Sequence, residues 1–333
     1  MDKKLVARYY QKFGIVTVVS VYLLIMVGGI VRTTGSGMGC PDWPKCFGQW
    51  VPPTDASELP ANYKQVFKVQ GKEIADFNAV HTWIEYINRL VGALIGLFIF
   101  ITFLLSLSFI KSDRQITLLS FLSLLAVGFQ GWLGAQVVSS NLAPYMITLH
   151  MLMALLIVGV LIYTVTRSYR QSLSGKVVKQ KRKLNLLLIA GIVLSLVQIV
   201  LGTQVREAVD TIARAFNYTQ RELWVGEMGV AFYVHRSFSL VVLGVHAWFA
   251  WVLYKQGAAA TLFTKGAVIL AGLLAAEIFS GAMMAWFAIP RFLQPLHLLL
   301  GTLVFGVQII MLIAINNDII FKKPAKKQAE LVN

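Results

Sequence analysis

Hydrophobic residues are concentrated in eight long runs along the chain, separated by shorter polar segments. Each run is long enough to cross a bilayer core of about 30 Å as an α-helix. The pattern therefore predicts an all-α integral membrane protein with eight transmembrane helices. The predicted spans cover residues 13–31, 84–110, 116–138, 146–166, 184–203, 230–254, 266–288 and 294–316.

The composition supports this fold class. Of 333 residues, 57% are hydrophobic and only 14% are charged, and the mean hydropathy is +0.69. These values lie outside the range of soluble globular proteins. A basic stretch that includes Lys3, Lys4 and Lys12 precedes the first span, and no small-residue cleavage site follows that span. We therefore expect an anchored first helix rather than a cleaved signal peptide.

The formal net charge of +15 falls on one side of the predicted membrane. The two termini and every second loop carry 19 Lys and Arg against four acids, whereas the alternate loops carry nine of each sign. Because basic loops stay in the cytoplasm, both termini are predicted to be cytoplasmic in a multi-pass protein of the inner (plasma) membrane. The long loop 32–80 then lies outside. This distribution explains the charge without nucleic acid as a partner.

An internal repeat relates the two halves of the chain. Asn88-Arg in the second span matches His235-Arg in the sixth, and His150 and His297 each follow 62 residues later. Agreement to the residue indicates a duplicated four-span unit of equal orientation.

The repeat predicts two tandem, pseudo-symmetric four-helix bundles. The N-terminal half covers 1–170 with the outer loop 32–80, and the C-terminal half covers 171–333. The segment from Thr166 to Lys183 is the expected linker. Two further matches are Phe129-Gln-Gly131 with Phe279-Ser-Gly281, and Val31-Arg32 with Val205-Arg206.

Two histidines of the C-terminal half are the strongest candidates for chemistry. His235 and His297 lie near the outer ends of two spans of one bundle, and histidine inside a bilayer is by default a functional candidate. Two imidazoles that converge in a bundle core suit axial ligation of a haem iron. The alternative is two unrelated histidines that are hydrogen-bonded in the packing. His246 lies off the same turn, and we expect it to be a packed interior residue.

The N-terminal half offers only part of this ligand set. His150 occupies the place of His297, but Asn88 stands where the second ligand is expected, and an amide is a poor haem ligand. His81, Glu85 and Asn88 share one helix face directed toward His150. A haem here either binds five-coordinate on His150, which leaves a site for dioxygen, or also recruits His81.

Charged residues near these positions have two interpretations each. Glu85 is a candidate proton donor or stabiliser of a developing cation, or else a carboxylate paired with Arg89 or Arg32. Arg89 and Arg236 directly follow the ligand positions and are predicted to hold haem propionates at the outer boundary. The alternative for both arginines is a snorkelling anchor.

Cys40 and Cys46 are the two cysteines of the chain, and both fall in the first outer loop. An oxidising compartment permits a disulfide there, and two prolines constrain the short segment between them. The alternative is two free thiols.

These features together resemble the haem A synthase family across nearly the whole chain. The segment that runs from the glycines at the end of the first span into the two cysteines and their tryptophan is the most specific part. The matching residues are Gly28-Gly-Ile-Val-Arg-Thr-Thr-Gly-Ser-Gly37, Cys40-Pro-Asp-Trp-Pro-Lys-Cys46, Glu85-Tyr-Ile-Asn-Arg89, His150, His235-Arg236 and His297.

The resemblance implies a b-type haem between His235 and His297 and a substrate, haem O, in the N-terminal half. A ring methyl of haem O would be oxidised to the formyl group of haem A by successive hydroxylations, in the biogenesis of aa3-type cytochrome oxidase. It further implies that Glu85 is required for catalysis and that Cys40 and Cys46 form a disulfide. The expected partners are a haem O synthase that delivers the substrate, a membrane electron donor and a second copy of the chain. Asn88 departs from the family pattern, which usually has histidine there.

Two other functions compete with this interpretation. A non-catalytic b-type cytochrome could pass electrons between a quinone and the cysteine pair, although it would not require Glu85 and a one-sided ligand set. A transporter predicts broken helices at matching points of the two halves, for which Gly28-Gly29 and Gly202 are the candidates.

Overall fold

The computed structural model describes residues 3–170, 178–256 and 262–320, and within these ranges the chain is helical with no β-strand. Part of the expected linker (171–177) and the basic C-terminal tail lie outside the described residues. Eight helices are long and apolar enough to cross a membrane, which confirms the predicted spans. They are α1 (Lys3–Thr33), α3 (Ala79–Ser106), α4 (Arg114–Ser139), α5 (Pro144–Ser168), α7 (Lys181–Ala215), α8 (Val230–Tyr254), α9 (Leu262–Trp286) and α10 (Leu293–Ile315).

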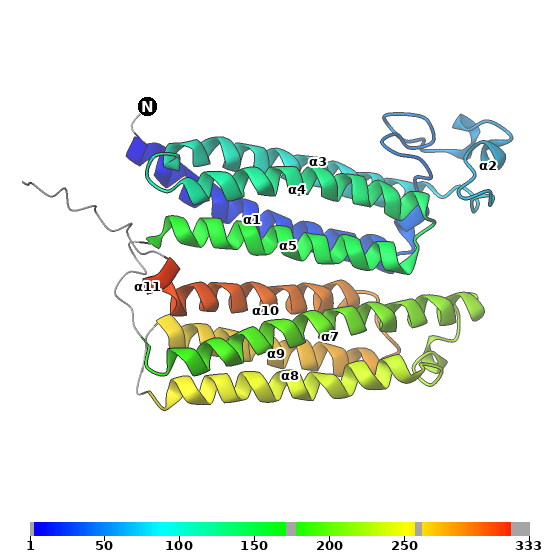
Figure 1. The fold of residues 1–333 in the computed structure, drawn as a ribbon. Coiled ribbons are helices and arrows are strands. Elements are labelled where there is room, and N and C mark those ends of the chain that lie inside the picture. The colour runs from blue at the N-terminus through cyan, green and yellow to red at the C-terminus, as the bar shows by residue number, and fades with distance from the viewer. Residues whose placement is uncertain (1–2, 171–177, 257–261, 321–333) are drawn as a thin grey trace, which may run out of the picture.

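Short helices complete the secondary structure. They are η1 (Ser36–Met38), η2 (Ala56–Glu58), α2 (Tyr63–Val66), η3 (Leu107–Phe109), η4 (Arg221–Leu223) and α11 (Asn317–Ile320). The segment between α1 and α3, which contains α2, projects from one end of the molecule (Figure 1). We call this end the loop end, and the end that carries α11 the opposite end.

The long helices begin at residues that suit helix starts. Asn78 caps α3, because its side-chain oxygen accepts a hydrogen bond from the backbone N–H of His81 at 3.1 Å. Pro144 occupies the first turn of α5, where a missing N–H costs nothing. These caps fix the loop ends of two helices of the N-terminal half.

Helix α7 is longer than the sequence pattern predicts. It continues to Ala215, past the predicted end at residue 203, although charged residues begin at Arg206. Val209 and Ala213 are spaced by four residues, and both are buried against Trp224 and Met228. This apolar stripe keeps the extension helical beyond the apolar run.

The eight long helices form two groups of four. Helices α1, α3, α4 and α5 pack as one group and α7, α8, α9 and α10 as the other, and Figure 1 shows the two groups as layers. Helix α10 is the most central, because half of its apolar window is buried, compared with 17–28% in the other seven. It packs on α1 and α5 of the N-terminal half. At Gly29 of α1 a Cβ would lie 3.1 Å from the Cα of Pro295, so the two backbones approach closely.

Helices α1 and α7 are continuous through their glycines. Gly28 and Gly29 lie inside α1, and Gly202 lies inside α7. The helix breaks that the transporter alternative predicts at these points are therefore absent from α1 and α7.

Candidate functional site

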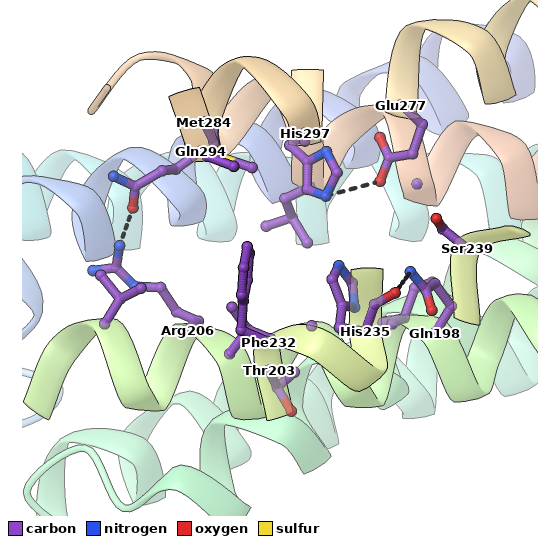
Figure 2. Close-up of a pocket in the computed structure, with 18 of the residues that line it drawn as sticks. Gln198, Thr203, Arg206, Phe232, His235, Ser239, Glu277, Met284, Gln294 and His297 are labelled. Carbon is purple, nitrogen blue, oxygen red and sulfur yellow. Dashed lines mark hydrogen bonds and ion pairs between the residues drawn. The ribbon is translucent and has the colours of Figure 1, made fainter. Parts of the chain in front are cut away.

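His235 of α8 and His297 of α10 face each other in a cavity of the C-terminal half (Figure 2). Their ring centroids are 6.3 Å apart, and the ring planes are inclined by 72°. Both rings line a cavity of about 250 Å³. The expectation that these side chains converge across the bundle core is confirmed by this contact.

Each ring lies against a glycine of a neighbouring helix. A Cβ at Gly202 of α7 would lie 3.2 Å from Cε1 of His235, and a Cβ at Gly281 of α9 would lie 3.3 Å from Cε1 of His297. Larger residues at these positions would push the imidazoles aside. The glycines therefore help to set the ring positions.

Hydrogen bonds orient His297 and leave one of its nitrogens facing a carboxyl group. Ser280 donates its hydroxyl hydrogen to the carbonyl oxygen of Glu277 at 2.9 Å and lies 2.9 Å from Nδ1 of His297. Ser280 is then an acceptor for Nδ1–H, and the lone pair of His297 is on Nε2. Nε2 lies 3.3 Å from Oε1 of Glu277. Glu277 of α9 is therefore a neighbour of His297.

The N-terminal half repeats part of this arrangement. His150 of α5 lies beside Gly134 of α4, whose Cβ would be 3.5 Å from Cε1 of the ring. Gln130 donates a hydrogen bond to the carbonyl oxygen of His150 at 3.0 Å, as Gln198 does to that of His235. The immediate surroundings of His150 thus resemble those of the two histidines of the C-terminal half.

The structural register corrects one match of the sequence repeat. Gln130, Gly134 and His150 each lie 147 residues before Glu277, Gly281 and His297, respectively. The counterpart of Gly281 is therefore Gly134 and not Gly131. The interval of 147 also separates Asn88 from His235. Applied to the seventh span, it matches Glu277 with Gln130, and this match could have indicated Glu277 as a neighbour of His297.

Asn88 of α3 occupies the position equivalent to His235. Its Oδ1 is buried, as is Nδ1 of His150, and neither atom has a hydrogen-bond partner among the described residues. Gly28 of α1 is the repeat counterpart of Gly202. A Cβ at Gly28 would meet no atom within 4 Å, so the space beside Gly28 is open. His81 lies in the first turn of α3, where its carbonyl oxygen would be 2.4 Å from a Cβ at Gly39.

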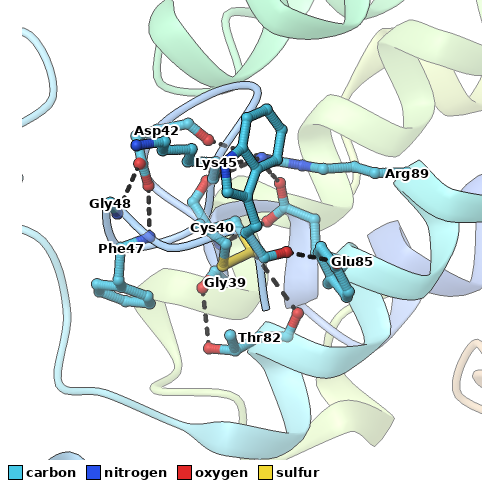
Figure 3. The surroundings of a disulfide bond; sticks show 12 residues. Gly39, Cys40, Asp42, Lys45, Phe47, Gly48, Thr82, Glu85 and Arg89 are labelled. Atoms are coloured by element: carbon cyan, nitrogen blue, oxygen red, sulfur yellow. Dashed lines mark hydrogen bonds and ion pairs between the residues drawn. A yellow bond between two sulfur atoms is a disulfide. The ribbon is translucent and has the colours of Figure 1, made fainter. Parts of the chain in front are cut away.

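Glu85 is directed to the disulfide loop between α1 and α3 (Figure 3). Its side chain is buried, with Oε2 accepting a hydrogen bond from the backbone N–H of Cys40 at 2.9 Å and Oε1 2.5 Å from Nη2 of Arg89. The interpretation that Glu85 pairs with Arg89 is confirmed. Both carboxylate oxygens are thus bonded to groups at the loop end.

The two cysteines belong to this loop, and Arg89 of α3 bonds to its backbone. Cys40 and Cys46 form a disulfide and are fully buried. Arg89 donates hydrogen bonds to the carbonyl oxygens of Cys40, Asp42 and Lys45 at 2.9, 2.7 and 3.0 Å. Its guanidinium is therefore used by the loop backbone, and the structure does not place it as a free cation over the N-terminal bundle.

Arg236 does not line the cavity of the C-terminal half. Its side chain is exposed on α8, and the guanidinium lies 5.8 and 5.3 Å from the ring centroids of Phe232 and Tyr233. Arg32 and Arg206 line the cavity instead. The sequence had singled out this pair as a repeat match without a role.

His246 lies deeper in the C-terminal half, away from the two facing rings. It is buried, with Nδ1 2.7 Å from the carbonyl oxygen of Val242 and Nε2 2.7 Å from the amide nitrogen of Gln308. The expectation of a packed interior histidine is confirmed.

Comparison with known families gives a match over most of the chain. The model of the cytochrome oxidase assembly protein family (COX15-CtaA) matches residues 11–309. This range contains both histidines of the C-terminal cavity, His150 and the disulfide loop.

Relatives with the name Heme A synthase are similar at low identity. The protein of Shewanella oneidensis is 31% identical over 157 residues, which are 46% of this chain and 45% of that protein. The protein of Nitrosomonas eutropha is 32% identical over 160 residues, 44% of each chain. The chain thus spans less than half the length of these two relatives. The protein of Novosphingobium aromaticivorans is 26% identical over 315 residues, 85% of this chain and 88% of that protein.

Proposed function

Because the chain belongs to the cytochrome oxidase assembly protein family, we propose that it is a haem A synthase, a membrane oxidoreductase that converts haem O to haem A. The reaction oxidises a ring methyl of haem O to a formyl group by successive hydroxylations. The facing pair His235 and His297 is the observation that carries the proposal.

The geometry of this pair fits a b-type haem. Two metal–nitrogen bonds of about 2 Å, with about 1 Å from each nitrogen to its ring centre, separate the centroids of two axial imidazoles by about 6 Å. The observed 6.3 Å agrees with this separation. His297 also has the second partner that metal-bound histidines usually have, because its Nδ1 is bonded to Ser280. A haem b held here would supply reversible one-electron transfer.

We assign the substrate, haem O, to the N-terminal half with His150 as its protein ligand. The N-terminal half has only one histidine of the pair, because Asn88 stands at the position equivalent to His235. This difference supports the assignment, since it would leave one face of the substrate iron free for dioxygen. His81 lies seven residues before Asn88 on α3, which places it about 10 Å nearer the loop end. Because two axial nitrogens are only about 4 Å apart, His81 is at the wrong level to replace the missing ligand.

Glu85 and Arg89 support the reaction by holding the disulfide loop against the loop end of α3. Glu85 accepts a hydrogen bond from the backbone N–H of Cys40, and Arg89 donates hydrogen bonds to the carbonyl oxygens of Asp42 and Lys45. Gly39 permits this close contact with His81. We propose that the loop closes the substrate site toward the aqueous phase, so that Glu85 acts in catalysis as a positioning residue.

The orientation follows from the charge distribution. The loop end lies outside the cell, and both termini lie in the cytoplasm. A membrane electron donor reduces the enzyme, and haem O synthase delivers the substrate within the bilayer.

The decisive experiment is co-expression with a haem O synthase, followed by an optical spectrum of the purified protein and chromatography of its extracted haems. Haem B together with haem O, its hydroxylated form or haem A supports the proposal. Haem B alone, with substrate supplied, would contradict it and favour a non-catalytic b-type cytochrome.

A further inference from the structure

Two arginines, one from each half, meet at the loop end of the C-terminal cavity. Arg32 is in the last turn of α1, and Arg206 is in the extension of α7. Nη2 of Arg32 lies 3.1 Å from Oδ2 of Asp210, and Nη2 of Arg206 lies 2.6 Å from Oδ1 of the same residue. Arg206 also donates hydrogen bonds to the backbone oxygen of Arg32 and to the side-chain oxygen of Gln294. We call Arg32 and Arg206 the arginine pair.

The charges in this region are not balanced. The arginine pair shares a single carboxylate, and the Nε atoms of both side chains are buried without a partner in the described part of the chain. Arg221 is near the same end of the cavity, because it donates a hydrogen bond to the carbonyl oxygen of Ile289, a lining residue. Burial, together with the nearby Arg291, lowers the pKa of Arg221 itself. The excess of guanidinium groups and the orphan donors are the properties of an anion site.

The cavity below the arginine pair suits a flat apolar body. Its lining includes the apolar side chains of Val205, Val209, Phe232, Met284 and Ile289. Figure 2 shows Arg206 and Gln294 at one end of the pocket and His235 and His297 farther along it. A ligand that fills this space therefore has an apolar ring system and carboxylates on one edge.

We propose that the arginine pair binds the two propionates of the haem held between His235 and His297. This inference rests on the proposed function. The N-terminal half thereby contributes Arg32 to the cofactor site of the C-terminal half. Arg236, which follows the ligand His235 in sequence, is excluded from this role because it lies outside the cavity, over the rings of Phe232 and Tyr233.

The test compares haem B with its dimethyl ester, in which the propionate charges are removed. Full-length protein carrying His150→Ala is purified without haem from a haem-deficient host, so that only the C-terminal site is read. Binding is followed through the low-spin spectrum of an iron with two imidazole ligands. We expect this parent protein to bind the diacid about 10- to 100-fold more tightly than the ester.

Arg32→Gln and Arg206→Gln should each reduce this preference about tenfold, while binding of the ester changes little. The matched control Arg236→Gln removes the same charge from an exposed site and should alter the preference less than about twofold. Because the preference is a ratio of two affinities in one preparation, a lower yield of folded variant does not affect it.

An unchanged preference in both variants of the arginine pair would overturn the inference. Failure of the proposed function has a different result, since the C-terminal haem and its ester discrimination would persist while co-expression with haem O synthase yielded no oxidised haem. Absence of the low-spin spectrum in the parent protein would remove both the haem site and the arginine pair's role.

Discussion

The two halves of this protein have similar helix packing but different interiors. Equivalent residues of the two halves are separated by 147 positions in α8 and α10, and by 174 positions in α7, as the match of Val31-Arg32 with Val205-Arg206 shows. By these intervals, three buried polar residues of the C-terminal half have buried apolar counterparts in the N-terminal half. The pairs are Ser195 with Val21, His246 with Ile99 and Gln308 with Leu161.

In the C-terminal half these residues form one network. The amide nitrogen of Gln308 lies 2.8 Å from Oγ of Ser195 and 2.7 Å from Nε2 of His246. Ser195 also lines the cavity that contains His235. The counterparts in the N-terminal half belong to one hydrophobic cluster. At these three positions, one helical scaffold thus holds a polar network in the C-terminal half and apolar side chains in the N-terminal half.

This difference teaches that the bundle packing does not depend on the polar residues. A buried polar network is costly unless its members are bonded to one another, and apolar residues of similar shape can replace it. We therefore attribute the network in the C-terminal half to the proposed haem site above it rather than to the fold. Substitutions at equivalent positions of the two halves test this comparison.

The largest effect is expected from the histidines. His297→Ala should weaken retention of the C-terminal haem by at least about 100-fold, because an axial ligand is lost. His150→Ala should leave that haem in place and abolish conversion of haem O. Haem content by spectrum and product by chromatography distinguish the two variants, and full haem B in His297→Ala would remove the C-terminal assignment.

Glu85→Ala should reduce product formation by about 10- to 100-fold while sparing the C-terminal haem. The substitution leaves Arg89 buried without its carboxylate and frees the N–H of Cys40, which loosens the disulfide loop. Turnover is measured beside accessibility of the loop to limited proteolysis. Glu73→Ala, which removes an exposed carboxylate from the same loop, is the matched control. A tight loop in an inactive Glu85→Ala protein would contradict the positioning role.

Asn88→His makes the N-terminal site resemble the C-terminal one. Gly28 is the repeat counterpart of Gly202, which lies against His235, and a Cβ at Gly28 would meet no atom within 4 Å. We therefore expect the variant to retain substrate haem about tenfold more tightly and to give it a second low-spin signal. His81→Ala should change neither property, since His81 lies at another level of the helix. Loss of substrate haem in His81→Ala would show instead that His81 is a ligand.

The smallest effect is expected in the polar network. Gln308→Leu should lower the free energy of unfolding by about 1–3 kcal/mol, because His246 and Ser195 lose their shared partner in the interior. The triple variant Ser195→Val, His246→Ile and Gln308→Leu copies the N-terminal half and should be less destabilised than the single variant. Unfolding in mixed micelles measures the free energy of unfolding of both variants. A triple variant that is destabilised more than the single variant would refute the comparison.

Sequence patterns alone were enough to predict the number of spans, to place the basic segments on one side of the membrane, and to identify His235 and His297 as candidates for chemistry. These properties depend on local rules, because transfer of an apolar run into a bilayer requires only length and hydrophobicity, and a helical register follows from residue spacing. The exact interval between repeats is also present in the sequence, and it relates Asn88 to His235 and His150 to His297.

The contacts between charged side chains, in contrast, depend on the packing of helices in the tertiary structure. Arg89 and Arg236 follow equivalent positions, yet one bonds to the disulfide loop and the other is exposed over aromatic rings. Arg32 and Arg206 meet at Asp210 because α7 extends past its apolar run and α1 ends beside it. Long side chains can reach in several directions, so the partner that each one finds depends on neighbouring helices that are distant in sequence.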